Sequence, residues 1–120
     1  MEILNIEGTD DTPRVVLDKE HNIFEISGRS LPEDSVDFYK PILKWITDYK
    51  QDSNTTTEFV FKLEYSNTSS SKLIQDILTA LKEINGIKVI WCYRQDDEDM
   101  EEAGREFSEQ VDIHFEFKSY

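Results

Sequence analysis

From residue 36 onward, helix-like and strand-like apolar patterns alternate, and this alternation constrains the fold more than any other feature of the sequence. Apolar residues at helical spacing mark three segments: 36–49, 72–84 and the very acidic 96–109. Apolar runs typical of strands mark 58–65, 87–93 and 111–117. Because strands that alternate with helices need crossover connections, this order predicts a largely parallel sheet with right-handed connections.

The first thirty residues predict a strand hairpin instead. Strand-like runs at 14–18 and 23–27 are separated by four residues that are mostly polar, which is a typical length for a hairpin turn. A weaker alternating run at 2–6 is a candidate edge strand, and we expect Gly28 to end the second hairpin strand.

Local signals refine these elements. Asp34 or Ser35 can cap the first helix, and Pro41 inside it predicts either a kink or a later helix start. The almost unbroken apolar run 87–93 predicts a central strand covered on both faces. We therefore expect a single α/β domain over residues 1–120, with an N-terminal hairpin, three main helices and a mixed, mainly parallel sheet of five to six strands.

The formal net charge of −13 bears on the partners that the chain can bind. It repels nucleic-acid phosphates and anionic membrane surfaces, so neither is expected as a partner, whereas a basic protein surface would be attracted. The acidic N-terminus lacks the features of a signal peptide, and no apolar run approaches the roughly 20 residues of a membrane span. The sequence thus predicts a cytoplasmic protein.

A row of four hydroxyl residues follows the strand at 58–65 and leads into the next helix: Thr68, Ser69, Ser70 and Ser71, followed by Lys72. Free backbone N–H groups at a helix start carry partial positive charge and stabilise an anion such as a phosphoryl group. Asn67 and Lys72 would then help to hold the phosphate. The simpler interpretation is that Asn67, Thr68 or Ser69 only caps the helix and the rest is a solvated polar loop.

Other polar residues complete the predicted site without forming a catalytic one. Arg29 and Ser30 follow a strand end and are candidates for the same edge of the sheet as Thr68. His21, His114 and the lone Cys92 show no catalytic or metal-ligand spacing, so no catalytic residue, metal or cofactor is expected. The acidic run from Asp96 lacks the spacing of a calcium loop, and we leave open whether it is a partner surface or only solvated.

Several segments of the chain resemble the SiaC family of bacterial regulatory phosphoproteins. The most specific are YSNTSSSKLIQDIL and SGRSLPED, and the resemblance extends through TPRVVLD and DDEDMEEAGREFSE. It covers nearly the whole chain in order. The resemblance implies a fold similar to the STAS domain of anti-sigma-factor antagonists.

The same resemblance implies a function. A kinase would phosphorylate Thr68, with Ser69 and Ser70 as alternatives, and a PP2C-like phosphatase would remove the phosphate. The unmodified form would bind and activate a diguanylate cyclase, raising cyclic di-GMP and favouring biofilm formation. This describes a non-enzymatic switch; the alternatives are a partner-switching protein like an anti-sigma-factor antagonist, or a constitutive interaction scaffold.

Overall fold

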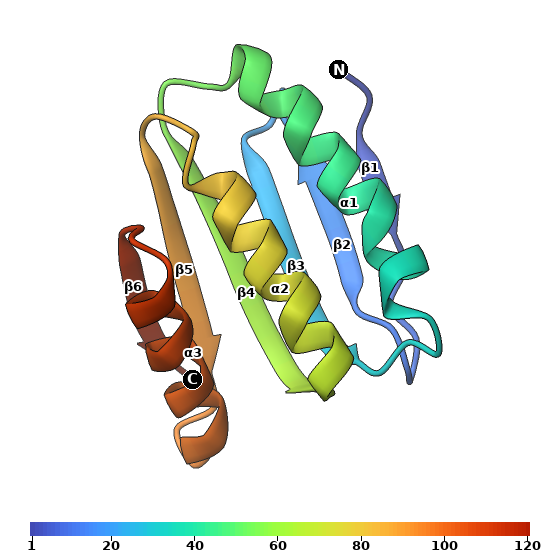
Figure 1. Ribbon diagram of the computed structural model, residues 1–120, viewed down its shortest axis with the longest axis vertical. Helices are drawn as coiled ribbons and strands as arrows, with labels where there is room; N and C mark the ends of the chain where they lie inside the picture. The colour runs from blue at the N-terminus through green and yellow to red at the C-terminus, as the bar shows by residue number, and fades with distance from the viewer.

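The sheet adds its six strands in chain order from one edge to the other (Figure 1). The computed structural model describes residues 1–120. The strands are β1 (Leu4–Ile6), β2 (Arg14–Asp18), β3 (Ile23–Ser30), β4 (Thr57–Ser66), β5 (Ile87–Tyr93) and β6 (Phe115–Ser119). The helices are α1 (Ser35–Tyr49), α2 (Thr68–Leu81) and α3 (Glu98–Gln110), and a short 3-10 turn, η1 (Lys50–Asp52), follows α1.

The pairing of the strands confirms the hairpin and corrects the expected balance of directions. β1, β2 and β3 pair antiparallel, and β3 to β6 pair parallel. Three of the five pairings are parallel and two are antiparallel, so the sheet is mixed as expected, and its parallel share is only a little over half. The reason is connection length: the short links before β3 reverse the chain directly, whereas each later link contains a crossover helix.

All three helices cover one face of the sheet (Figure 1). Each crossover steps to the next strand on the same side, and right-handed crossovers that step the same way place their helices on one face. The prediction that β5 is covered on both faces is therefore wrong. Val89 and Trp91 belong to the core cluster under the helices, whereas Ile90 is buried outside that cluster, on the face that no helix covers, and Cys92 is only half-buried.

One apolar core fills the space between the two layers and contains 22 buried residues. In β4 the side chains alternate: Phe59 and Phe61 are buried, while Glu58 and Lys62 are exposed. Helix α3 approaches the sheet closely because Gly104 lies over Trp91, where an added Cβ would stand 2.4 Å from the indole. The outer face of the sheet carries charged side chains such as Glu58 and Lys62 beside a few apolar ones such as Val60 and Ile90.

Near the carboxyl edge of the sheet, the end of β3 and the start of α1 differ from the predictions. β3 continues through Gly28 to Ser30, because a register shift after Gly28, whose φ is 102°, lets the strand resume its pairing. Helix α1 begins at Ser35 with Asp34 as its cap and passes through Pro41, so the prediction of a start nearer Pro41 is wrong. Pro41 lies on the exposed side, where water can satisfy the carbonyl that it leaves unbonded.

In the second half of the chain, the starts of α2 and β6 also differ from the predictions. Helix α2 begins at Thr68 and not at Lys72. The Asn67 side chain is the N-cap, so the hydroxyl row forms the first turn of the helix. Strand β6 begins at Phe115 and not at Val111. Val111 instead terminates α3, where its N–H donates to the Phe107 carbonyl and its side chain is buried.

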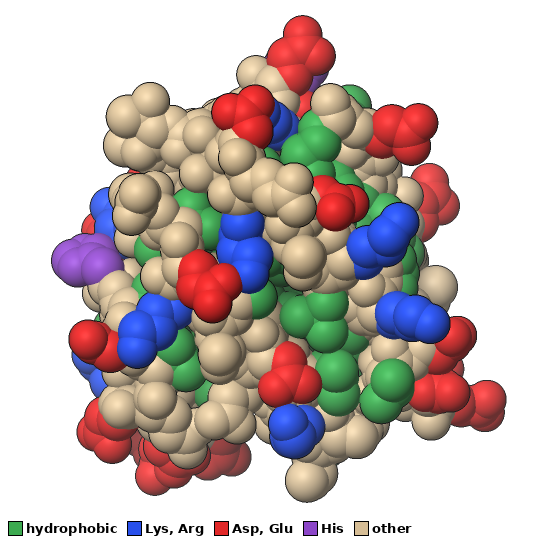
Figure 2. All heavy atoms as spheres, turned by 45° about the horizontal axis from the view of Figure 1, so that its top comes forward, with side chains coloured by type: hydrophobic (Ala, Val, Ile, Leu, Met, Phe, Trp, Pro, Cys, Tyr) green, Lys and Arg blue, Asp and Glu red, His purple; other side chains and the backbone are tan.

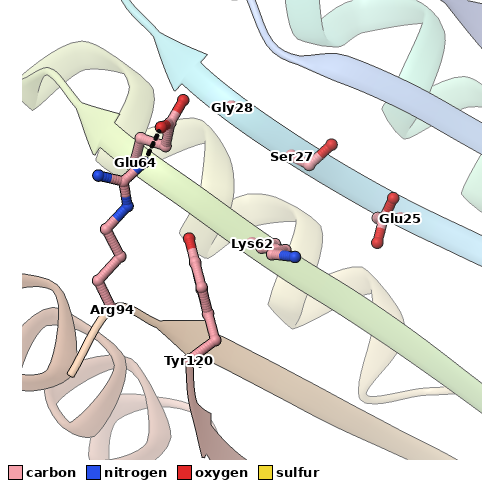
Figure 3. A pocket seen from close by; sticks show the side chains of 7 residues that line it. All are labelled: Glu25, Ser27, Gly28, Lys62, Glu64, Arg94 and Tyr120. Carbon is pink, nitrogen blue, oxygen red and sulfur yellow. Dashed lines mark hydrogen bonds and ion pairs between the residues drawn. The ribbon is translucent and has the colours of Figure 1, made fainter.

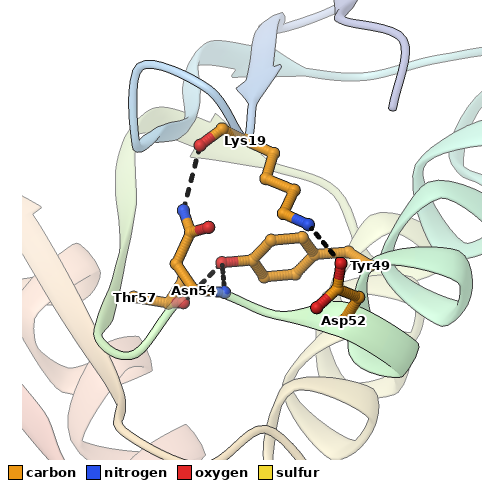
Figure 4. Close-up of polar contacts among 5 residues, drawn as sticks. All are labelled: Lys19, Tyr49, Asp52, Asn54 and Thr57. Carbon is orange, nitrogen blue, oxygen red and sulfur yellow. Dashed lines mark hydrogen bonds and ion pairs between the residues drawn. The ribbon is translucent and has the colours of Figure 1, made fainter.

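The amino end of the parallel strands is tied together by a compact set of polar contacts (Figure 4). The amide of Asn54 donates to the Lys19 carbonyl at 3.0 Å, and its backbone N–H donates to the Tyr49 hydroxyl at 3.1 Å. That hydroxyl also bonds Thr57 at 2.7 Å, and Lys19 pairs with Asp52 at 3.0 Å. These contacts join the hairpin turn to the α1–β4 connection and leave the opposite, carboxyl end of the sheet as the place where α1 and α2 begin.

Candidate functional site

The hydroxyl row lies at the carboxyl ends of β3 and β4, where the sequence places it. The Asn67 N–H donates to the Ser30 carbonyl at 3.0 Å, which joins the ends of the two strands. The Asn67 side chain then accepts from the Ser70 N–H at 2.9 Å and caps α2. One asparagine therefore fixes both the strand end and the helix start, and Thr68 follows directly.

Thr68 is the first residue of α2 and is exposed. Its hydroxyl makes no hydrogen bond within the protein, and the side-chain cap reaches Ser70 and not the Thr68 amide. A free hydroxyl beside free helix N–H groups is accessible to a modifying enzyme and suited to hold a negative charge.

The other hydroxyls of the row have structural partners. The Ser69 hydroxyl lies 2.7 Å from that of Ser35 and donates to the Asn67 side chain at 3.2 Å. Ser71 donates to the Asn67 carbonyl at 3.3 Å. Of the four, only Thr68 leaves its hydroxyl unbonded.

Ser70 is the centre of a buried polar network. Its side chain is 0% exposed and donates to the Ser30 carbonyl at 3.2 Å. The Ser30 hydroxyl donates to Ser70 at 2.9 Å and lies 2.6 Å from the Tyr39 hydroxyl. Burial raises the pKa of Tyr39, against the lowering effect of these hydrogen bonds, so the hydroxyl stays protonated at neutral pH. Because a kinase cannot reach Ser70 in this fold, it is not a candidate for modification.

Two of these contacts come from residues that the site prediction did not include. Ser35 and Tyr39 belong to α1, far from the hydroxyl row in sequence. The apolar pattern assigns Tyr39 to the core, and Ser35 is one of two possible caps. Only the packing of α1 beside α2 brings both to the corner.

The two basic residues expected at the site point elsewhere. Lys72 pairs with Asp76 at 3.2 Å, one turn further along α2. The Arg29 guanidinium donates to the Asp10 carbonyl at 3.2 Å and lies 5.9 Å from the centre of the Tyr65 ring. Neither cation forms a hydrogen bond with Thr68. The partial positive charge near this hydroxyl therefore comes from the free backbone N–H groups at the start of α2.

The uncovered face of the sheet carries a shallow hollow of about 430 Å³ (Figure 3). Arg94 pairs with Glu64 at 2.6 Å and Glu25 pairs with Arg14 at 3.3 Å, while Lys62 lies 4.5 Å from the centre of the Tyr120 ring. The charged groups of the hollow are thus engaged with their neighbours, and no nucleophile and base are paired in it.

Two broader properties bear on function. No group of three or more His, Cys, Asp and Glu side chains is arranged to hold a metal ion. None of the helices combines the length and apolar character that a membrane crossing requires.

The fold and this corner define a class: a small α/β domain with one helix layer and an exposed threonine hydroxyl at a helix start. The family model of SiaC family regulatory phosphoproteins matches residues 6–120. The chain therefore belongs to the SiaC family, as the segments around Thr68 suggest.

Solved structures and a curated relative agree with this membership. The crystal structure of apo-SiaC from Pseudomonas aeruginosa is 30% identical, with a TM-score of 0.88 over 98% of this chain and 99% of that one. SiaC in the crystal structure of the diguanylate cyclase SiaD with its activator SiaC, from the same organism, is 29% identical, with a TM-score of 0.90 over the same shares. An uncharacterized protein of Pseudomonas aeruginosa strain UCBPP-PA14 is 29% identical over 100% of this chain and 98% of its own length.

Proposed function

We propose that this protein is a non-enzymatic switch in which reversible phosphorylation of Thr68 controls binding to, and activation of, a diguanylate cyclase. A protein kinase adds the phosphate, and a PP2C-like phosphatase removes it. The unmodified form binds the cyclase in the cytoplasm, and the resulting cyclic di-GMP favours biofilm formation. Support comes from family membership and from the crystal structure of the diguanylate cyclase SiaD in complex with its activator SiaC.

The observation that carries the choice of residue is the state of the Thr68 hydroxyl. It is exposed and unbonded at the first position of α2, whereas the hydroxyls of Ser69, Ser70 and Ser71 hold the corner together. Modifying Thr68 therefore breaks no internal hydrogen bond. Modifying any of the three serines would break at least one.

The physical basis of the switch is a change of charge on an intact surface. A phosphoryl group adds about −1.5 to −2 charges and three acceptor oxygens. At the start of α2 it interacts favourably with the helix dipole, so the fold is kept. A partner that covers this corner must then desolvate a dianion, at a cost of several kcal/mol unless it supplies a cation. Since about 1.4 kcal/mol is a tenfold change in affinity, one phosphate is enough.

The experiment combines modification and binding. Incubation with the kinase of the source organism is expected to add one phosphoryl group, roughly 80 Da, to the peptide that contains Thr68. Modification of other residues only would reject the site. The Thr68→Ala variant is expected to bind and activate the cyclase like the parent protein.

The charge variant tests the mechanism. Thr68→Asp is expected to bind the cyclase at least about tenfold more weakly. Thr79→Asp is the matched control, because Thr79 is an exposed threonine further along the same helix. Equal binding by Thr68→Ala and Thr68→Asp would favour a constitutive scaffold. Binding to an anti-sigma factor and to no cyclase would favour a protein like an anti-sigma-factor antagonist.

A further inference from the structure

A groove separates α2 from α3, and Thr68 lies just beyond one end of it. Helices α1 and α2 pack against each other, whereas a hollow of about 280 Å³ opens between α2 and α3, and a second of about 270 Å³ continues it between the end of β4 and the start of α3. The two hollows share Ser71 and Ala103, so they form one groove. On α2 the wall is made by Ser71, Lys72 and Gln75, and Thr68 precedes Ser71 by one turn on the same helix face.

The floor of the groove is apolar and its α3 side is acidic. Met100, Ala103 and Phe107 form the apolar part. Asp99 and Glu106 stand on the same side, and neither forms an ion pair within the protein. The only cation on the walls, Lys72, is paired with Asp76. Acidic side chains gather along this edge of the molecule, at the lower left of Figure 2, where α3 lies.

We propose that this groove is the docking site for a basic amphipathic helix of the partner protein. The inference rests on the proposed function and extends it, because it names the surface and the chemistry of the partner. An apolar stripe on the partner helix covers Met100, Ala103 and Phe107. Lysine or arginine side chains beside that stripe meet Asp99 and Glu106.

The length and shape of the groove favour a helix. Its α3 wall extends from Asp99 to Gln110, twelve residues that span about 16 Å of helix axis. Three turns of a partner helix match this length, and an apolar groove between two helices is a common site for an amphipathic helix. The acidic wall also opposes acidic partners and raises the association rate of basic ones.

The position of Thr68 connects the groove to the switch. A helix that lies along Ser71 and Gln75 reaches the start of α2, where Thr68 is exposed. A phosphate there stands at the end of the groove on the α2 side, away from Asp99 and Glu106 where the basic residues of the docked helix lie, so the dianion is desolvated without a matching cation. Phosphorylation would therefore act on the same surface that binds the partner.

The test uses the full-length protein and, as probe, the purified diguanylate cyclase of the source organism that is similar to SiaD. Glu106→Lys reverses a charge on the wall, and we expect binding about tenfold weaker and less sensitive to salt. Glu102→Lys is the matched control: the same charge change on the same helix, outside the groove. It is expected to bind within about twofold of the parent protein.

A second pair of variants tests the other wall. Gln75→Arg places a bulky cation in the groove and is expected to weaken binding about tenfold, whereas Thr79→Arg lies outside it and is expected to change binding little. Circular dichroism of every variant checks that it is folded. Equal binding by Glu106→Lys and Glu102→Lys, or by Gln75→Arg and Thr79→Arg, would overturn the proposal that the groove is the docking site. The proposal that the protein binds a cyclase would remain intact. No binding by the parent protein would overturn both.

Hydrogen exchange gives an independent readout on the unmutated protein. On addition of the cyclase, amides in 71–75 and 103–110 are expected to exchange more slowly, while α1 beyond its first turn stays unchanged. Slower exchange confined to the uncovered face of the sheet would contradict the groove while confirming that the cyclase binds.

Discussion

The hydroxyl oxygens of Ser35 and Ser69 lie 2.7 Å apart, and this hydrogen bond joins the first turns of α1 and α2. The two residues are 34 positions apart in the sequence. Since Ser69 follows Thr68 directly, the bond fixes the position of the candidate phosphorylation site relative to α1. A side chain that looks like an ordinary loop serine therefore helps to hold the surface that a partner would meet.

The first prediction concerns this pair. Ser35→Ala and Ser69→Ala are each expected to lower the free energy of unfolding by about 0.5–1.5 kcal/mol, because each removes the same hydrogen bond. The double variant is expected to lose less than the sum of the two. Urea unfolding of the four proteins in a double-mutant cycle measures the difference. Strictly additive losses would show that the two hydroxyls do not interact.

The second prediction separates the helix cap, Asn67, from the proposed phosphorylation site, Thr68. Asn67→Ala is expected to cost about 1 kcal/mol of stability, because the Ser70 N–H loses its acceptor. Thr68→Ala is expected to stay within about 0.5 kcal/mol of the parent protein, because its hydroxyl is unbonded and exposed. Thermal unfolding of both variants checks the contrast. A large loss for Thr68→Ala would mean that the threonine has a structural role.

The third prediction states how charge at Thr68 affects the fold. Thr68→Asp is expected to raise the free energy of unfolding by about 0.3–1 kcal/mol at low ionic strength, since a carboxylate at the start of α2 interacts favourably with the helix dipole. The gain should shrink in high salt. Denaturant unfolding at two salt concentrations measures it. Destabilisation at low salt would instead indicate a switch that works by melting the helix.

The fourth prediction follows from the buried hydroxyl of Tyr39. Burial raises its folded-state pKa above the ordinary value near 10. The contribution of this group to stability is therefore fully present below about pH 10 and is lost as pH rises toward the folded-state pKa. Tyr39→Phe is expected to be less stable at pH 7 by about 1 kcal/mol and to lose less stability between pH 10 and 11. Parallel alkaline profiles for the two proteins would contradict this.

The fifth prediction concerns the contact between α3 and the sheet. Gly104→Ala places a methyl group against the Trp91 indole and is expected to cost about 1–3 kcal/mol. It should also alter the fluorescence of Trp91, whose N–H donates to the Met100 carbonyl. Glu102→Ala, at an exposed position of the same helix, is the control and is expected to stay within about 0.5 kcal/mol of the parent protein.

The sequence predicts the order of elements well because each has a clear period. The hairpin, the three crossover helices and the strand at Ile87–Tyr93 all occur where the pattern places them. The hydroxyl row also lies at the carboxyl end of the sheet, as expected. Family membership, suggested by the segments around Thr68, is confirmed by the family model.

The errors share a physical cause, which is that local pattern does not report tertiary neighbours. An apolar run such as β5 is compatible with cover on both faces, and only the strand order shows that the helices share one side. Gly28 signals a strand end, but pairing with β4 carries β3 past it. The separate environments of Thr68 and Ser70 depend on which way each side chain points at the helix start. Composition alone cannot distinguish them.

The one-sided helix layer also accounts for the unusual composition. A strand flanked by helices on both sides needs apolar residues throughout, whereas here Glu58, Lys62 and Glu64 of β4 are exposed on the uncovered face. An apolar share of only 38% is thus sufficient for the one core between the sheet and its helix layer. Helices on the second face would require these outward-facing strand positions to be apolar as well.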